Sequence, residues 1–359
     1  MNTNQVKLSS KLLGRFNLMV SSGSIRAILA GTGAGLACQM AQLDSFATIG
    51  GVSGGSIPTL LLAAKIEPKV ILDKIIELDF ADLVPARQTL GQFFLSWLKP
   101  KDKRSHAYQG LRTSAPLGEF MESLVPVWPD NYWTVAARNG NPVLFTSKGV
   151  FEYQKGKVVQ VKTGRPSVSH AIRASCAIPG IIEAVDYEGM RLFDGGYSVH
   201  GGMPCELVCE HFGKSLKSVL AIDFTNCSKD TFLARGLMYL SRCISNHMET
   251  EFHHEYLLKA AAVISPKLAW LTGRLPLKLS IEQKENAIME GFREAYYVLK
   301  LKGLLPEQTA DKLGFASLSF DNLRQAVSTS PNVVANASWF PRLLSQGLET
   351  ITAWVKKVA

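Results

Sequence analysis

The chain has 359 residues, of which 47% are hydrophobic and 19% are charged, and its net charge is +9 at pH 7. This composition is typical of a globular protein with a sizeable core, built as one large domain or two smaller ones. The positive charge favours a negatively charged partner. Arginine-rich tracts, zinc-finger spacings and aromatic RNA-binding motifs are absent, so we expect an anionic membrane surface and no nucleic acid, with simple solubility as the alternative.

The sequence carries no recognisable targeting or membrane-spanning segment. No run approaches the roughly eighteen apolar residues of a transmembrane helix, and residues 1–16 lack the features of a signal peptide. The six cysteines form no CxxC pair, so we expect them to be reduced and buried. We therefore predict a cytoplasmic, peripherally membrane-associated protein, with export that needs no N-terminal signal left open.

The elements alternate between strand and helix over the first two thirds of the chain. We expect an N-terminal arm over residues 1–21, a strand over 25–30 and a glycine loop over 31–35. The remaining predicted elements are helices over 36–43, 57–66, 70–80, 117–124 and from 170, and strands over 46–49, 133–137, 142–146, 151–161, 190–194 and 219–224. This alternation predicts an α/β sheet covered on both faces.

Strand signals stop after about residue 228. Helical patterns cover 233–264, 281–302, 311–327 and 345–358. We therefore predict a main domain over 22–227 and a helical region over 228–359 that acts as a cap, a membrane contact or an oligomerisation surface. The apolar run 93–98, followed by the basic run 99–104, predicts either a mobile lid that docks on membranes or a core helix with a solvated loop.

The stretch Gly51-Val52-Ser53-Gly54-Gly55 reads G-x-S-x-G between a predicted strand and a predicted helix. This is the context of a nucleophile elbow, a strained turn that pushes a serine oxygen out of the sheet. Neighbouring glycines are needed because such a turn crowds the backbone. The alternative is a glycine-rich turn in which Ser53 only caps the helix.

The earlier stretch Gly31-Thr32-Gly33-Ala34-Gly35 allows three readings. A phosphate loop would need a lysine that is absent, and a dinucleotide loop would need glycine where Leu36 stands. The third is an oxyanion hole, which the nearby serine elbow favours.

Two further motifs follow, Arg173-Ala174-Ser175-Cys176-Ala177-Ile178-Pro179-Gly180 and Asp194-Gly195-Gly196. With the elbow and the glycine loop, they resemble the patatin-like phospholipase family over about residues 22–225. The resemblance implies a three-layer α/β/α sandwich with a mostly parallel sheet and a phospholipase A or lysophospholipase activity on acyl-ester lipids. It also implies a Ser–Asp dyad that works through an acyl-serine, without histidine, metal or cofactor.

Carried onto this sequence, the resemblance implies Ser53 as nucleophile and Asp194 as its base. The expected oxyanion donors are the N–H groups of Gly31, Thr32, Gly33, Ala34 and Gly54, and the supporting glycines are Gly51, Gly55, Gly195 and Gly196. The sequence departs from the family at the loop, where the family pattern resembles G-G-G-x-[KR]-G but Thr32 replaces a glycine and no basic residue follows. This departure supports the alternative of a low-activity lipid-binding or regulatory protein, and an acyltransferase would use the same dyad.

Three other arrangements are consistent with the sequence. A Ser–Asp–His triad could use His200 or His211, and Asp223 could replace Asp194 as base, although Asp223 is more typical of a turn. A metal site could use Glu251, His254 and His247, but the required second motif is absent and a solvated helix face is favoured. Need for a homo-oligomer or an activator, lipid head-group preference and the acyl position cleaved are left open.

Overall fold

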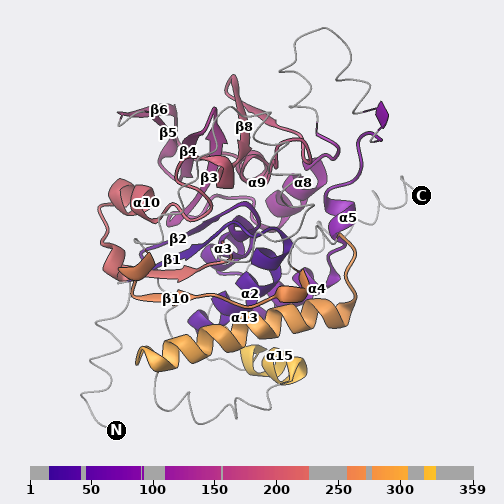
Figure 1. The fold of residues 1–359 in the computed structure, drawn as a ribbon, viewed down its shortest axis with the longest axis vertical. Coiled ribbons are helices and arrows are strands. Elements are labelled where there is room, and N and C mark those ends of the chain that lie inside the picture. Colours follow the sequence, from indigo (N-terminus) through magenta and orange to yellow (C-terminus); the bar gives the residue numbers. More distant parts are fainter. Residues whose placement is uncertain are drawn as a thin grey trace.

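The computed structural model describes residues 16–41, 46–89, 91–92, 110–154, 157–225, 257–271, 277–305 and 319–328. Within these ranges the chain forms a mixed sheet of ten strands (Figure 1). The strands are β1 (Asn17–Val20), β2 (Thr48–Val52), β3 (Tyr132–Arg138), β4 (Asn141–Thr146), β5 (Gly149–Gln154), β6 (Lys157–Thr163), β7 (Val185–Tyr187), β8 (Met190–Asp194), β9 (Val219–Ile222) and β10 (Ala262–Ile264). The helices are α2 (Ile25–Met40), α3 (Ser56–Ala63), α4 (Pro68–Glu77), α5 (Phe80–Leu83), α8 (Ala115–Leu124), α9 (Val168–Ser175), α10 (Cys205–Phe212), α13 (Ile281–Leu301) and α15 (Phe320–Ser328).

The sheet combines a parallel half with an antiparallel half. Strands β10, β9, β1, β2 and β3 lie side by side in that order and are parallel, whereas β3, β4, β5 and β6 form an antiparallel meander. Strand β8 also pairs with β3, antiparallel, and carries β7 on its outer side. The predicted α/β class is confirmed, and the mostly parallel centre of the sheet is the part from β10 to β3.

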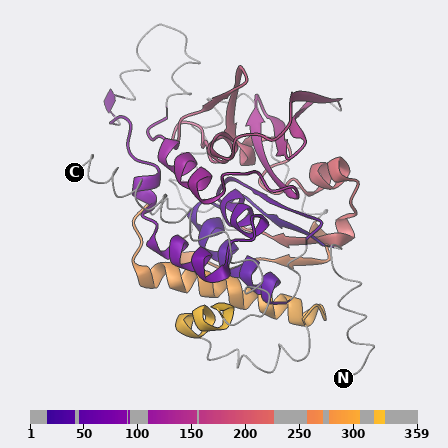
Figure 2. The same ribbon diagram turned by 180° about the vertical axis from the view of Figure 1, so that it is seen from behind.

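Helices pack against both faces of the sheet, so the molecule has three layers. Along β1, Leu18 and Val20 belong to the main core, while Met19 between them belongs to a second core under α10. This alternation is the period-two pattern of a strand buried on both sides. On the main face α13 runs alongside α2 with α15 next to it, in both views (Figure 1, Figure 2).

The N-terminal predictions were wrong in their placement. The first strand is β1, which lies inside the predicted arm, and the predicted strand 25–30 is the start of α2. Almost every residue from Ile25 to Cys38 is buried, so α2 is apolar around its circumference. A short all-apolar run of this kind cannot be told from a buried strand by its period.

The glycine stretch 31–35 is also helical, in the middle of α2. A side chain at position 33 would run into the backbone carbonyl of Ile288 on α13, and one at position 35 would run into Leu62 on α3. These glycines therefore allow close packing of helices rather than forming a loop. Thr32 is accommodated because its hydroxyl donates to the Ile28 carbonyl at 2.6 Å.

The structure confirms most of the later elements and corrects the C-terminal region. Strand β10 lies in the part predicted as wholly helical, and it extends the sheet by pairing with β9. Helix α13 matches the prediction over 281–302. The runs 93–104, 233–256 and 345–358 lie outside the described residues. No helix among those described is long and apolar enough to cross a bilayer, and the four described cysteines, Cys38, Cys176, Cys205 and Cys209, are free and buried.

Candidate active site

Ser53 lies on a strained turn between β2 and α3. Its φ angle is 56°, in the left-handed region that non-glycine residues avoid, at a cost on the order of 1–3 kcal/mol. One turn of 3-10 helix, Ser53–Gly55, leads directly into α3. Gly51 and Gly55 face each other so closely that a side chain at position 51 would collide with the Gly55 carbonyl. The predicted strand, elbow and helix are confirmed.

A polar network holds this turn in place. The Ser53 N–H donates to Ser175 Oγ at 2.9 Å, and the Ser175 hydroxyl donates to the Val135 carbonyl at 2.8 Å. The Ser56 hydroxyl donates to the Ser53 carbonyl at 2.5 Å. Ser175 belongs to the Arg173–Gly180 motif, and the sequence alone did not reveal the structural role of this motif. It satisfies a buried backbone donor that an ordinary helix start would leave unpaired.

The sheet register brings Asp194 next to Ser53. On β3, Val135 pairs with Val52 of β2, and the next residue, Ala136, pairs with Asp194 of β8. Strand β8 therefore takes up the edge of β3 where β2 ends, and Ser53 and Asp194 leave their strands at the same point. Gly195 is required there, because any side chain would collide with the Val135 carbonyl.

The Asp194 carboxyl is buried and only half satisfied. Its Oδ1 accepts the Gly196 N–H at 2.8 Å, while Oδ2 is buried without a hydrogen-bond partner among the described residues. Burial raises the pKa of Asp194 from 3.8 to about 7, and the nearby Ser53 hydroxyl and the Gly196 N–H oppose this rise. The Ser53 hydroxyl thus lies close enough to favour the charged form, although no formed hydrogen bond joins the two side chains. Such contacts often tighten only when substrate binds.

The turn between β1 and α2 lies against the elbow. Ser24 precedes α2 with φ of 54°, and a side chain at position 54 would collide with the Ser24 carbonyl. The first N–H groups of a helix have no partner within the helix, so those at the start of α2 can bind an anion. Ser24, Ser53 and Gly54 all line one cavity.

The predicted oxyanion donors therefore need correction. The N–H groups of Gly31, Thr32, Gly33 and Ala34 lie in the interior of α2, where backbone amides bond to carbonyls one turn earlier. Gly54 is where the prediction placed it. The stretch that corresponds to G-G-G-x-[KR]-G is instead Ser22-Gly23-Ser24-Ile25-Arg26-Ala27. It keeps the second glycine and the basic residue, and Arg26 was the signal that could have located it.

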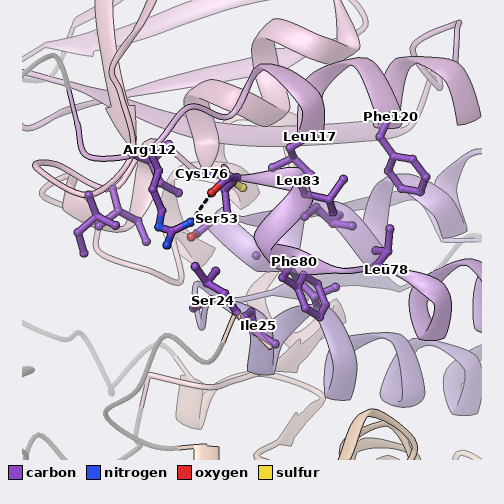
Figure 3. Close-up of a pocket in the computed structure, with 18 of the residues that line it drawn as sticks. Ser24, Ile25, Ser53, Leu78, Phe80, Leu83, Arg112, Leu117, Phe120 and Cys176 are labelled. Carbon is purple, nitrogen blue, oxygen red and sulfur yellow. Dashed lines mark hydrogen bonds between the residues drawn. The ribbon is translucent and has the colours of Figure 1, made fainter. Parts of the chain in front are cut away.

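An apolar cavity opens beside Ser53 (Figure 3). Its empty volume is about 770 Å³, including its open mouth. Its walls come from α2, α3, α5, α8 and the segments after α4 and α9, and the lining residues include Ile28, Ile57, Leu78, Phe80, Leu83, Val84, Leu117, Phe120, Met121, Ile178 and Leu277. A cavity of this size and character suits a hydrocarbon chain.

A comparison with models of known families identifies the family of the chain. The model of the family "Patatin-like phospholipase" matches residues 18–206, more than half of the chain. The chain belongs to the patatin-like phospholipase family. No match was found among curated proteins. The matched stretch runs from β1 to the start of α10 and includes Ser53 and Asp194, and the family implies an acyl hydrolase of lipids.

Beyond the patatin-like match, the chain completes the same sheet. Strands β9 and β10 lie after residue 206, and β9 pairs directly with the central β1. Helix α13, also outside the match, covers α2. The described strands and helices after residue 206 are therefore part of the body that carries the site.

Two other described candidate bases, His211 and Asp223, do not line the cavity beside Ser53. His211 lies on α10, and its Nδ1 is 2.5 Å from the Tyr153 hydroxyl of β5. Asp223 follows β9, where its Oδ1 accepts the N–H and the hydroxyl of Thr225 at 2.8 and 2.6 Å, as in a turn. The metal-type motif Glu251–His254 and His247 lie outside the described residues.

Proposed function

We propose that the chain hydrolyses fatty-acyl esters of lipids, as a phospholipase A or lysophospholipase, with Ser53 as nucleophile and Asp194 as base. The observation that carries this proposal is the buried Asp194 carboxyl, whose Oδ2 has no partner among the described residues, beside a serine on a strained elbow. A stable fold rarely keeps a strained serine and an unpartnered buried carboxylate oxygen at one point unless a reaction uses them. The apolar cavity at the same point supports an acyl chain as the group that binds there.

Each step can be written on these groups. Ser53 Oγ attacks the ester carbonyl carbon while its proton passes to Asp194 Oδ2. The developing oxyanion lies near the N–H groups of Ser24 and Gly54. Its collapse expels the alcohol, which takes the proton from Asp194 and leaves an acyl-serine. Water then attacks as Asp194 takes its proton, and the proton returns to Ser53 Oγ as the fatty acid leaves.

The electrostatics of Asp194 suit this work. A carboxylate of ordinary pKa is a weak base near neutral pH, whereas burial raises the pKa of Asp194 to about 7. A base whose pKa lies near the working pH takes up a proton readily and is still largely ionised. Direct contact with the serine is sufficient, so no histidine is needed between them.

Fatty-acid release from mixed phospholipid vesicles tests the proposal. We expect wild-type protein to release fatty acid, and Ser53→Ala and Asp194→Asn to lose nearly all release while staying folded. The matched controls are the exposed Ser123→Ala and Asp186→Asn, which should behave as wild type. Loss in Ser53→Ala alone would move the role of base to His200, His211 or Asp223. Release that is independent of Ser53 would overturn the mechanism.

The same assay separates hydrolysis from acyl transfer. Acyltransferase activity would appear as a new acyl lipid instead of free fatty acid when an acceptor lipid is added. The low-activity alternative keeps its support, because Ser22–Ala27 has serine or alanine at three of the four glycine positions of the family pattern. From the net charge of +9 we further propose a cytoplasmic protein that binds anionic membranes at their surface. Vesicle co-sedimentation that is indifferent to anionic lipid and salt would contradict this.

A further inference from the structure

The cavity beside Ser53 contains one charged side chain. Among the described residues that line it, all are apolar or small and neutral except Arg112. Figure 3 shows Arg112 on one side of Ser53 and the apolar side chains of Leu83, Leu117 and Phe120 on the other. The reacting serine therefore lies between a cation and a hydrocarbon-like chamber.

Arg112 is held firmly, but most of its donors are not used by the protein. The backbone N–H of Arg112 donates to the Ile181 carbonyl at 2.9 Å, and its backbone carbonyl accepts the Glu183 N–H at 3.0 Å. Its Nη1 donates to the Val84 carbonyl at 2.7 Å. A guanidinium has five N–H donors, and no other side-chain hydrogen bond or ion pair of Arg112 occurs within the part of the chain that the structure describes.

The carboxylate of Glu183, whose backbone bonds to Arg112, is already occupied by other groups. Glu183 accepts Arg87 Nη1 at 2.8 Å and Arg173 Nη2 at 3.2 Å, and it also accepts the Thr113 hydroxyl. Arg112, whose backbone bonds to Glu183, forms no ion pair with it. Among the described residues, Arg87 and Arg173 satisfy this carboxylate, and the half-buried Arg112 guanidinium at the cavity has no carboxylate partner. An uncompensated, partly desolvated cation costs free energy unless an anion binds to it.

We propose that Arg112 binds the phosphate that lies next to the scissile ester, and so selects phosphate-bearing acyl lipids over neutral ones. This inference rests on the proposed function, because it assigns the acyl chain and the phosphate of the proposed substrate to the two sides of Ser53. The acyl chain enters the apolar chamber, and the phosphate of the departing alcohol lies on the Arg112 side. Guanidinium groups bind phosphate oxygens through paired, charge-assisted hydrogen bonds, which makes arginine suited to this task.

A matched pair of substrates tests the proposal. Lauroyl lysophosphatidic acid and monolaurin differ by the phosphate alone. We expect wild type to favour the phosphate ester, and Arg112→Met to raise its KM by about 10- to 100-fold, the loss typical of a charge-assisted contact, with a much smaller change for monolaurin. Arg112→Lys should keep part of the preference, because it keeps the charge. Arg191→Met, which removes an exposed arginine outside the cavity, should keep all of it. Melting temperatures identify variants that have lost the Val84 contact and unfolded.

A binding measurement separates this proposal from the proposed function. Titration of wild type and Arg112→Met with dodecyl phosphate, laurate and dodecyl maltoside, each below its micelle concentration, needs no turnover. Arg112-dependent binding of dodecyl phosphate without any hydrolysis would support the anion site and reject the hydrolase. Ser53-dependent hydrolysis with equal losses on both substrates in Arg112→Met would overturn the anion site and keep the hydrolase. Laurate binding as tightly as dodecyl phosphate would assign Arg112 to the released fatty acid and overturn the phosphate assignment.

Discussion

The elbow region and the α2–α13 helix pair are both built on glycine, but they use it in opposite ways. Around the elbow, glycines let strained turns meet: position 54 lies against the Ser24 carbonyl and position 195 against the Val135 carbonyl. Between the helices, Gly33 lies against the Ile288 carbonyl, and Gly291 of α13 lies in the same way against Ala30. In each case a missing Cβ permits a close backbone approach.

The difference lies in what the approach leaves behind. The helix pair contains regular backbone and a closed apolar core. The elbow region keeps two non-glycine residues at positive φ, Ser24 and Ser53, and a buried carboxylate oxygen without a partner in the described chain. Strain and an unsatisfied charge lower stability, so their concentration at one point separates a site from a packing contact.

The largest expected effect that sharpens this comparison is the loss of activity when Asp194 is replaced. Asp194→Asn keeps an oxygen for the Gly196 N–H but removes the base, so we expect the hydrolysis rate to fall by about 10²- to 10⁴-fold. Because burial raises the pKa of Asp194 to about 7, the wild-type rate should rise with pH through that value as the carboxyl loses its proton. The measurement is the rate against pH for both proteins. A wild-type rate that stays flat from pH 5 to 9 would contradict the assignment.

The same variant should be more stable than wild type at alkaline pH. The folded-state pKa of Asp194 lies above its ordinary value of 3.8, so the stability contributed by this carboxyl is full below about pH 4 and is lost as the pH rises through 7. Each unit of pKa shift corresponds to about 1.4 kcal/mol. We therefore expect the unfolding free energy of Asp194→Asn to exceed that of wild type by an amount that grows between pH 5 and pH 8. A constant difference would show that the pKa of Asp194 is not raised in the folded protein.

Gly54→Ala is the next largest expected effect. The added Cβ would force the turn at Ser24 away, and with it the N–H groups proposed to bind the oxyanion. Loss of such a donor lowers rates by about 10²- to 10³-fold. Rates measured on the folded fraction should therefore fall steeply, whereas Gly91→Ala, where a Cβ meets only an ordinary contact, should have no effect. Full activity in Gly54→Ala would exclude the Ser24 turn from the oxyanion hole.

Gly33→Ala should affect stability rather than activity. The new Cβ would meet backbone atoms of Ile288 and Phe292, so α2 and α13 must separate. We expect a loss of about 2 kcal/mol in unfolding free energy, despite a helix-propensity gain of about 1 kcal/mol. Denaturant unfolding of Gly33→Ala and Gly291→Ala should show similar losses, with Tyr297→Ala on the exposed side of α13 as the control. A loss of rate per folded molecule would reopen the oxyanion interpretation of residues 31–35.

These two regions also show what the sequence could and could not predict. Ser53 and Asp194 could be predicted as a pair because their motifs combine a reactive residue with glycines at fixed spacing, and the sheet register brings them together. The turn that we propose for the oxyanion hole was missed because residues 31–35 contain more glycine than Ser22–Ala27. Glycine count does not distinguish a turn from a helix that packs closely, since both require a missing Cβ.

Other features depend on contacts between distant parts of the chain. Strand β10 has three residues, Ala262–Ile264, and is stabilised by β9 rather than by its own pattern. Arg112 lies in no motif, and its relation to the cavity depends on backbone bonds to Ile181 and Glu183. Such features need the folded chain, because a single residue in a loop carries no period and no spacing.

The smallest expected effect joins the two regions, at Lys284 of α13. Its Nζ donates to the carbonyls of Ile76 and Leu78 at 2.7 and 2.6 Å, which caps the end of α4, and it lies 6.0 Å from the centre of the Phe80 ring. Because Leu78 and Phe80 line the cavity, Lys284→Met should cost about 1–2 kcal/mol of stability and raise KM for long acyl chains while short-chain esters are unaffected. Lys300→Met, at an exposed site of the same helix, is the control. An equal change in KM for short and long chains would mean that Lys284 stabilises the helix pair without shaping the acyl chamber, and the two regions would then be energetically separate.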